Sequence, residues 1–207
     1  AQRRQIVANQ PRLERDHGPA VAAEAAAVAR SRRRLAQLKV PVHLGVVWAM
    51  YGETGRMVPS SAHPHGEDFV RAKVAQLDWL ADGLPGLSWS ILAVDDGCPD
   101  HPSSAEVMSG IAETEGYPTQ GHRSVTVLRL AQVIAAHAGI SPAFARLTST
   151  QDSRKGGSIL AGLDAALRTG PAPASDSLEW SGSSESSSGA RHVLCYTDAD
   201  LSANLAQ

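Results

Sequence analysis

The amino-acid sequence predicts one α/β domain built on a mostly parallel sheet with helices on both faces. Short apolar runs rich in β-branched residues alternate with stretches whose apolar residues recur at helical spacing. This alternation of strands and helices is typical of a parallel sheet. The length of 207 residues and the hydrophobic content of 43% are enough for one domain with a real core, and the chain is too short for two.

The first 40 residues differ in charge from the rest of the chain. Residues 1–40 contain nine Lys or Arg against three Asp or Glu, whereas residues 41–207 contain ten against eighteen. We interpret 1–40 as a basic lead-in and helix, in which 1–19 is polar and mobile and the Ala-rich stretch 19–38 is a surface helix. The simplest interpretation of its charge is a solvated helix. Peripheral contact with acidic lipids or with a partner protein is the alternative.

The organised domain is assigned to residues 41–207. Its expected strands are 42–48, 88–94, 124–130 and 191–197. Its expected helices are 67–82, 103–115 with Ser103 or Ser104 as N-cap, and 155–168, and the stretch 131–153 has mixed, partly helical signals. The Ser-, Pro- and Gly-rich stretch 170–189 is expected to be disordered or a loose surface loop.

Acidic residues follow two of the expected strands directly. Asp95 and Asp96 come after the second strand, and Asp198 and Asp200 come after the fourth. In open parallel sheets ligands bind outside the carboxyl ends of the strands, so both clusters are expected at the ligand edge. Two carboxylates at i and i+2 repel each other when they face one crevice, and a divalent cation such as Mg²⁺ or Mn²⁺ offsets that repulsion.

Each acidic cluster also has a simpler interpretation. The first could be an Asx-type turn that closes a strand, with Gly97 permitting the tight turn. The second could be an exposed turn with two solvated Asp residues. The triplet His63-Pro64-His65 is interpreted as a solvated loop rather than a metal site.

Four segments resemble motifs of family 2 glycosyltransferases, in the order in which that family has them. Their closest similarity is to the branch that transfers mannose or glucose to polyprenyl phosphate. The segments are VVWAMYGE (46–53), ILAVDDGCPD (91–100), SRKGGSILAGLDAAL (153–167) and YTDADLSANLAQ (196–207).

The resemblance implies a GT-A fold, which is a Rossmann-like sheet that binds a nucleotide sugar. It implies a metal-dependent, inverting glycosyltransferase that moves sugar from a nucleotide-diphosphate sugar to a hydroxyl or phosphate, with polyprenyl phosphate or a small molecule as acceptor. Asp198 and Asp200 then match the metal motif. The implied donor-binding residues are Tyr51, Glu53, Asp95, Asp96, Arg154, Lys155 and Asp198. An anion is also expected at a helix N-terminus opened by Lys155-Gly156-Gly157.

The chain departs from this family at several points. Ala49 stands where the family usually has Pro, and Gly52 where it usually has Asn. The family's acceptor-binding half and its catalytic base lie beyond the position of Asp200. The acceptor half is therefore expected to be absent from residues 1–207, and the catalytic residue is not assigned. Either those parts lie outside this sequence or the chain cannot transfer sugar alone.

Two other functions remain open at this point. One is a non-catalytic or incomplete module that binds sugar nucleotides. The other is a haloacid-dehalogenase-type phosphatase, because Asp198-x-Asp200-x-Ser202 is similar to the DxDx[TS] nucleophile motif of that class, which also needs a downstream Lys.

Composition indicates the cellular compartment to expect and the kinds of partner not to expect. The two cysteines, Cys98 and Cys195, form no disulfide framework or CxxC pair, which favours reduced thiols in the cytoplasm. No apolar run is long enough to span a membrane. The net charge of -2 gives no reason to expect nucleic acid as a partner.

Overall fold

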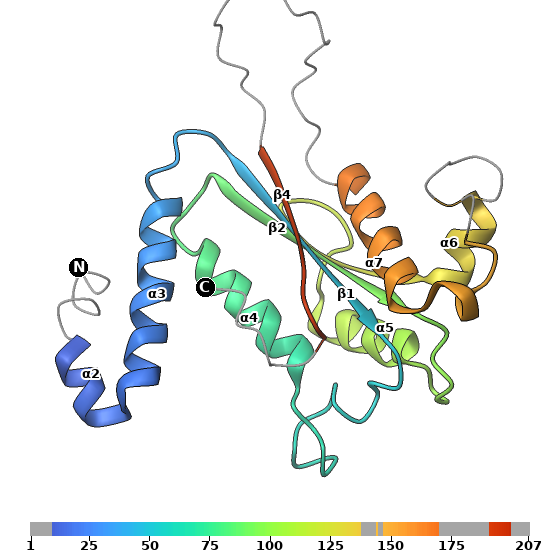
Figure 1. The fold of residues 1–207 in the computed structure, drawn as a ribbon, viewed down its shortest axis with the longest axis horizontal. Helices are drawn as coiled ribbons and strands as arrows, with labels where there is room; N and C mark the ends of the chain where they lie inside the picture. The colour runs from blue at the N-terminus through green and yellow to red at the C-terminus, as the bar shows by residue number, and fades with distance from the viewer. Residues whose placement is uncertain (1–9, 138–143, 145–146, 170–190, 200–207) are drawn as a thin grey trace, which may run out of the picture.

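The computed structural model describes residues 10–137, 144, 147–169 and 191–199 (Figure 1). The expected loop 170–189 and the residues 200–207, with Asp200, lie outside this part. The elements in chain order are α2 (Gln10–His17), α3 (Pro19–Leu35), β1 (Val42–Met50), α4 (Phe69–Ala81), β2 (Leu87–Asp95), α5 (Ser104–Glu115), β3 (Arg123–Arg129), α6 (Leu130–His137), α7 (Thr150–Thr169) and β4 (Arg191–Tyr196).

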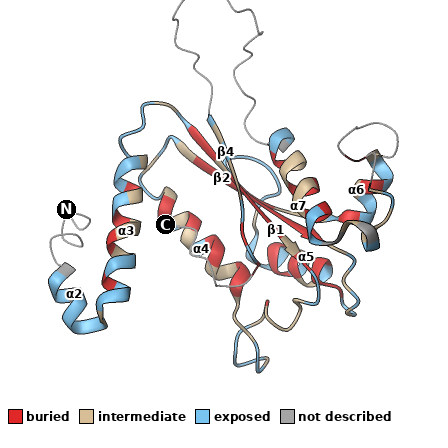
Figure 2. Ribbon diagram, viewed as in Figure 1, coloured by how far each residue is buried: buried red, intermediate tan, exposed pale blue. Residues whose placement is uncertain are grey.

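The four strands form one sheet in the order β3-β2-β1-β4, and every pair is parallel. All four expected strands are present, with ends shifted by one or two residues. β1 and β2 lie in the middle and are buried on both faces, which is why their sequences read as continuous apolar runs rather than as alternating ones (Figure 2). The predicted α/β class with a parallel sheet is confirmed.

Helices cover both faces of the sheet. On one face Trp48 of β1 and Ile91 of β2 pack with apolar side chains of α4 and α5, including Phe69 and Met108. On the other face Val47, Leu92 and Val94 pack against α7, with α6 beside it. α7 approaches β1 closely because Gly162 has no side chain, since a Cβ there would lie 2.2 Å from a methyl group of Val47.

The chain reverses its direction of travel across the sheet beside β1. It moves from β1 to β2 to β3, then returns through α6 and α7 to place β4 on the other side of β1. Successive connections on opposite sides of a strand leave a crevice outside its carboxyl end. The ends of β1 and β4 border this crevice, and the residues that follow them are the ones singled out by the sequence.

The start of α5 agrees with expectation, and the start of α7 does not. Ser103 caps α5 through a capping box with Glu106, so it is the cap of the two serines that the sequence left open. α7, however, begins at Thr150 and not at Lys155, because polar residues 150–153 form its first turn. Lys155-Gly156-Gly157 therefore lies inside the helix, and the expectation that it opens a helix N-terminus for an anion is wrong.

The N-terminal region is more ordered than expected. Residues 10–17, predicted to be mobile, form α2, which packs along α3 (Figure 1). α3 is also not a purely surface helix, because small alanines on one side of it are buried and Arg32 bonds to Asp82 and stacks on Trp79. No helix in the described ranges is long and apolar enough to cross a membrane.

Candidate functional site

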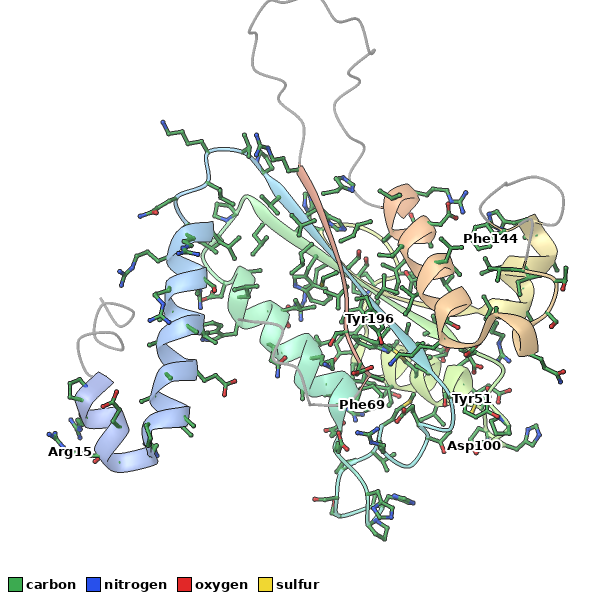
Figure 3. All side chains as sticks on the ribbon, viewed as in Figure 1. Arg15, Tyr51, Phe69, Asp100, Phe144 and Tyr196 are labelled. Carbon is green, nitrogen blue, oxygen red and sulfur yellow. The ribbon has the colours of Figure 1, made fainter. Side chains whose placement is uncertain are left out.

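A cavity of about 190 Å³ lies at the crevice beside β1. Its lining comes from the ends of β1, β2 and β4 and from α7, namely Ala49, Met50, Tyr51, Glu53, Arg56, Asp96, Lys155, Asp198 and Ala199. A more open hollow of about 560 Å³ shares Tyr51 and Asp96 with it and extends to Gly97, Thr150 and Gln151. Tyr51 is 61% exposed and stands at the end of β1 (Figure 3). Five of the seven predicted donor-binding residues thus line one cavity.

The turn after β1 and the turn after β2 are bonded to each other. The Glu53 amide donates to Ser104 Oγ at 3.0 Å, and that hydroxyl donates to Cys98 Sγ at 3.2 Å. Thr54 donates to Asp100 at 2.9 Å. These bonds fix the position of Glu53 relative to Asp96.

Both turns contain a glycine in the left-handed region. Gly52 has φ 69° and Gly97 has φ 82°. Such values are unstrained for Gly, and Asn tolerates them better than most residues. Gly52 therefore permits the turn after β1 without backbone strain.

Asp95 acts as a scaffold for the turn after β2. It is buried, and its Oδ1 accepts from the amides of Gly97 and Cys98 at 2.9 and 2.8 Å. Its Oδ2 accepts from the amide of Ala105 in the first turn of α5 at 2.9 Å. The carboxylate thus joins a strand end, a turn and a helix start. It lines neither of the two hollows.

Asp96 has the opposite surroundings. Its Oδ1 is buried and has no hydrogen-bond partner in the described part of the chain, although it lines the cavity. Burial raises the pKa of this carboxyl, the Ser158 hydroxyl lowers it, and the charge of Asp95 raises it further. The Ser158 hydroxyl therefore lies near this carboxyl, but its oxygen and Asp96 Oδ1 form no hydrogen bond with each other. An acceptor in this condition is suited to an N–H or O–H of a ligand.

Asp198 is already paired with a cation. Lys155 Nζ from α7 contacts its Oδ1, and the Tyr196 hydroxyl donates to the same oxygen at 3.1 Å. The Lys155 ammonium lies 5.3 Å from the centre of the Tyr196 ring. The hydrogen bond to Asp198, followed by Tyr196, raises the pKa of Lys155 above its ordinary value. Lys155 and Asp198 are 55% and 53% exposed.

Arg56 lines the cavity and was not predicted. It bonds to Glu53 at 3.1 Å and to Glu67 at 2.7 Å. The predicted donor-binding residue Glu53 is therefore ion-paired. The only signal in the sequence is the i, i+3 spacing of Glu53 and Arg56, which is too common to have identified the pair.

Two of the predicted site residues are not described by the structure. Asp200 lies outside the described residues, and so does the side chain of Arg154, whose backbone belongs to α7. His63 and His65 are neighbours, with ring centres 5.7 Å apart. Among the residues that the structure describes, no three His, Cys, Asp or Glu side chains are grouped to hold a metal ion.

The amino ends of the strands carry a different polar cluster. His43 of β1 is fully buried, and its ring nitrogens bond to the hydroxyls of Ser88 and Ser90 at 2.8 and 3.0 Å. Burial, followed by the neighbouring His192 and His122, lowers the pKa of His43 to about 4. Two further hollows lie at this end, and no residue predicted for the site lines them.

Comparison with known proteins adds no relative. No model of a protein family, no curated protein and no solved structure matches the chain.

Proposed function

We propose that this protein binds a nucleotide-diphosphate sugar in the cavity beside β1 and belongs to a metal-dependent glycosyltransferase. The observation that carries the proposal is the convergence of the four motif segments. Tyr51, Asp96, Lys155 and Asp198 come from separate segments of the sequence and line a single cavity at the reversal point of a parallel sheet.

The chemistry of the lining matches the parts of such a donor. Tyr51 offers an exposed aromatic face, and Asp96 Oδ1 is an acceptor without a partner, which suits the nucleoside. Lys155 carries a positive charge suited to a diphosphate. Arg154 is assigned to the diphosphate by resemblance alone. Glu53 is held by Arg56, so its proposed contact is with a neutral hydroxyl of the nucleoside.

The residues present fit a divalent cation in part. Asp198 supplies an accessible carboxylate, whose oxygens are of the hard type that Mg²⁺ and Mn²⁺ prefer. Asp200 is the second ligand proposed from the sequence. A bound cation would neutralise charge that develops on the departing diphosphate. The acceptor, a hydroxyl or a phosphate, and the catalytic base are not assigned to residues of this chain.

A thermal-shift panel of UDP-, GDP- and dTDP-sugars with Mn²⁺ tests the proposal. One donor is expected to raise the melting temperature in the presence of Mn²⁺, and Asp198→Ala and Asp200→Ala should each abolish that shift. Asp16→Ala, on the exposed helix α2, is the control and should keep it. A wild-type protein that responds to no donor would refute the proposal.

Activity measurements then separate the alternatives. Mn²⁺-dependent release or transfer of sugar selects the enzyme, whereas calorimetric binding without turnover selects the non-catalytic module. A phosphatase would instead form a stable complex with beryllium fluoride at Asp198.

A further inference from the structure

The carboxylate proposed to hold a metal is occupied by a side-chain cation. Lys155 reaches Asp198 from α7, and Tyr196 donates to the same carboxylate oxygen. A divalent ion binding at this oxygen would lie against the ammonium group, and two cations cannot share one oxygen at low cost. Either the metal is excluded or the ammonium moves.

We infer that Lys155 is a resident counter-ion that a divalent metal displaces from Asp198 and that then binds the diphosphate. This inference rests on the proposed function and deepens it. The long flexible stem of Lys155 allows the movement, and 55% of the side chain is exposed. Since both groups line one cavity, the released ammonium remains beside the anionic ligand.

Among the described residues, Arg56 is the other cation that lines the cavity, and it is a poorer candidate for this exchange. Its guanidinium is held by Glu53 and Glu67 from two sides, and only 31% of the side chain is exposed. Movement of Arg56 would break two ion pairs, those with Glu53 and Glu67. Movement of Lys155 breaks one, and the incoming metal neutralises Asp198 in its place.

The exchange predicts that metal and nucleotide assist each other. Metal alone must compete with Lys155, whereas metal together with a diphosphate offers the displaced ammonium a new anionic partner. The affinity for Mn²⁺ should therefore be higher in the presence of nucleoside diphosphate than in its absence, and the reciprocal must hold for the nucleotide.

The test measures Mn²⁺ binding to the full chain by electron paramagnetic resonance, first without nucleotide and then with UDP or GDP. Lys155→Met should bind Mn²⁺ alone about three- to fivefold more tightly than wild type, the range expected when an exposed ion pair no longer competes. The same variant should bind the Mn²⁺–nucleotide complex about tenfold more weakly. Lys155→Arg should retain both wild-type affinities to within about threefold.

Lys39→Met is the matched control, because it removes the same charge from an exposed residue before the opposite end of β1. It should leave both affinities unchanged. If Lys155→Met binds Mn²⁺ alone no more tightly than Lys39→Met, the exchange is refuted, while the proposed function stands as long as wild type binds Mn²⁺ and nucleotide. If wild type binds neither, the proposed function fails and the exchange fails with it.

Discussion

The two ends of the central strands differ in whether their buried polar atoms are hydrogen-bonded. At the amino end, both ring nitrogens of His43 are paired with serine hydroxyls. At the carboxyl end, Asp96 Oδ1 and Ser158 Oγ are buried without a hydrogen bond among the described residues. A buried acceptor without a partner costs about 1 to 3 kcal/mol, so the carboxyl end is less stable than it could be.

We interpret this difference as one between polar residues that stabilise the fold and polar residues proposed to bind a ligand. The contrast is sharpest between two neighbours in the sequence. Asp95 accepts three backbone hydrogen bonds, and Asp96 Oδ1 accepts none. Four predictions test whether this contrast is real.

The largest expected effect is on stability at Asp95. Asp95→Ala leaves three backbone amides without their acceptor and should lower the free energy of unfolding by about 3 kcal/mol or more. Asp96→Ala, which removes the Oδ1 atom that has no partner among the described residues, should leave it unchanged or raise it by up to about 3 kcal/mol. Urea denaturation of both variants measures the difference. Equal losses would contradict the division of roles between the two residues.

Acid should lower the free energy of unfolding through His43, at the amino end of β1. The pKa of His43 is lowered to about 4 from 6.5, so between these values the unfolded chain binds a proton that the folded chain does not. Stability should therefore fall as the pH falls from about 6.5 to 4, by up to about 3 kcal/mol from this residue. Its contribution should be constant above pH 6.5. The measurement is the unfolding free energy across this range, and His43→Gln should flatten the dependence.

Asp96 should respond to pH with the opposite sign. Because its pKa is raised, the carboxyl of Asp96 stays protonated to higher pH in the folded protein than in the unfolded chain. The contribution of Asp96 to the stability of the fold is therefore lost as the pH rises through the folded pKa. Asp96→Asn should remove this loss of stability with rising pH. It should also weaken nucleotide binding about tenfold. Comparing the pH profiles of wild type and Asp96→Asn, alongside calorimetry with UDP and GDP, tests both parts. A variant that binds as tightly as wild type would remove Asp96 from the site.

The smallest effect is expected at the exposed pair. Asp198→Asn should change the free energy of unfolding by less than about 1 kcal/mol, because solvent screens the attraction between Asp198 and Lys155. Thermal denaturation without ligand measures this. A much larger loss would mean that the pair is structural and belongs with Asp95 rather than with Asp96.

The sequence was sufficient for the strands and for the edge at which the acidic residues meet. Continuous apolar runs such as 42–48 and 88–94 left little ambiguity, and the cap of α5 was narrowed to Ser103 or Ser104. The sequence was insufficient to predict helix boundaries that depend on tertiary contacts. The start of α7 depends on how polar residues from Thr150 meet the turn after β2, and α2 depends on packing along α3.

The different surroundings of Asp95 and Asp96 also could not be predicted from the sequence. Adjacent, chemically identical residues differ only in the direction of their side chains. Arg56 illustrates the same limit, since nothing in a Glu53–Arg56 spacing shows that a second glutamate, Glu67, completes the cluster.

The missing side chain at Gly162 reaches further than its own surroundings. Lys155 is on the same helix, about two turns earlier, so the seating of α7 on β1 sets how far its ammonium group must stretch. A valine at position 162 would act as a wedge, lifting the helix from the strand and withdrawing the charge from Asp198. Gly162 does not line the cavity. The close packing that it permits nevertheless positions the charge of Lys155 beside Asp198.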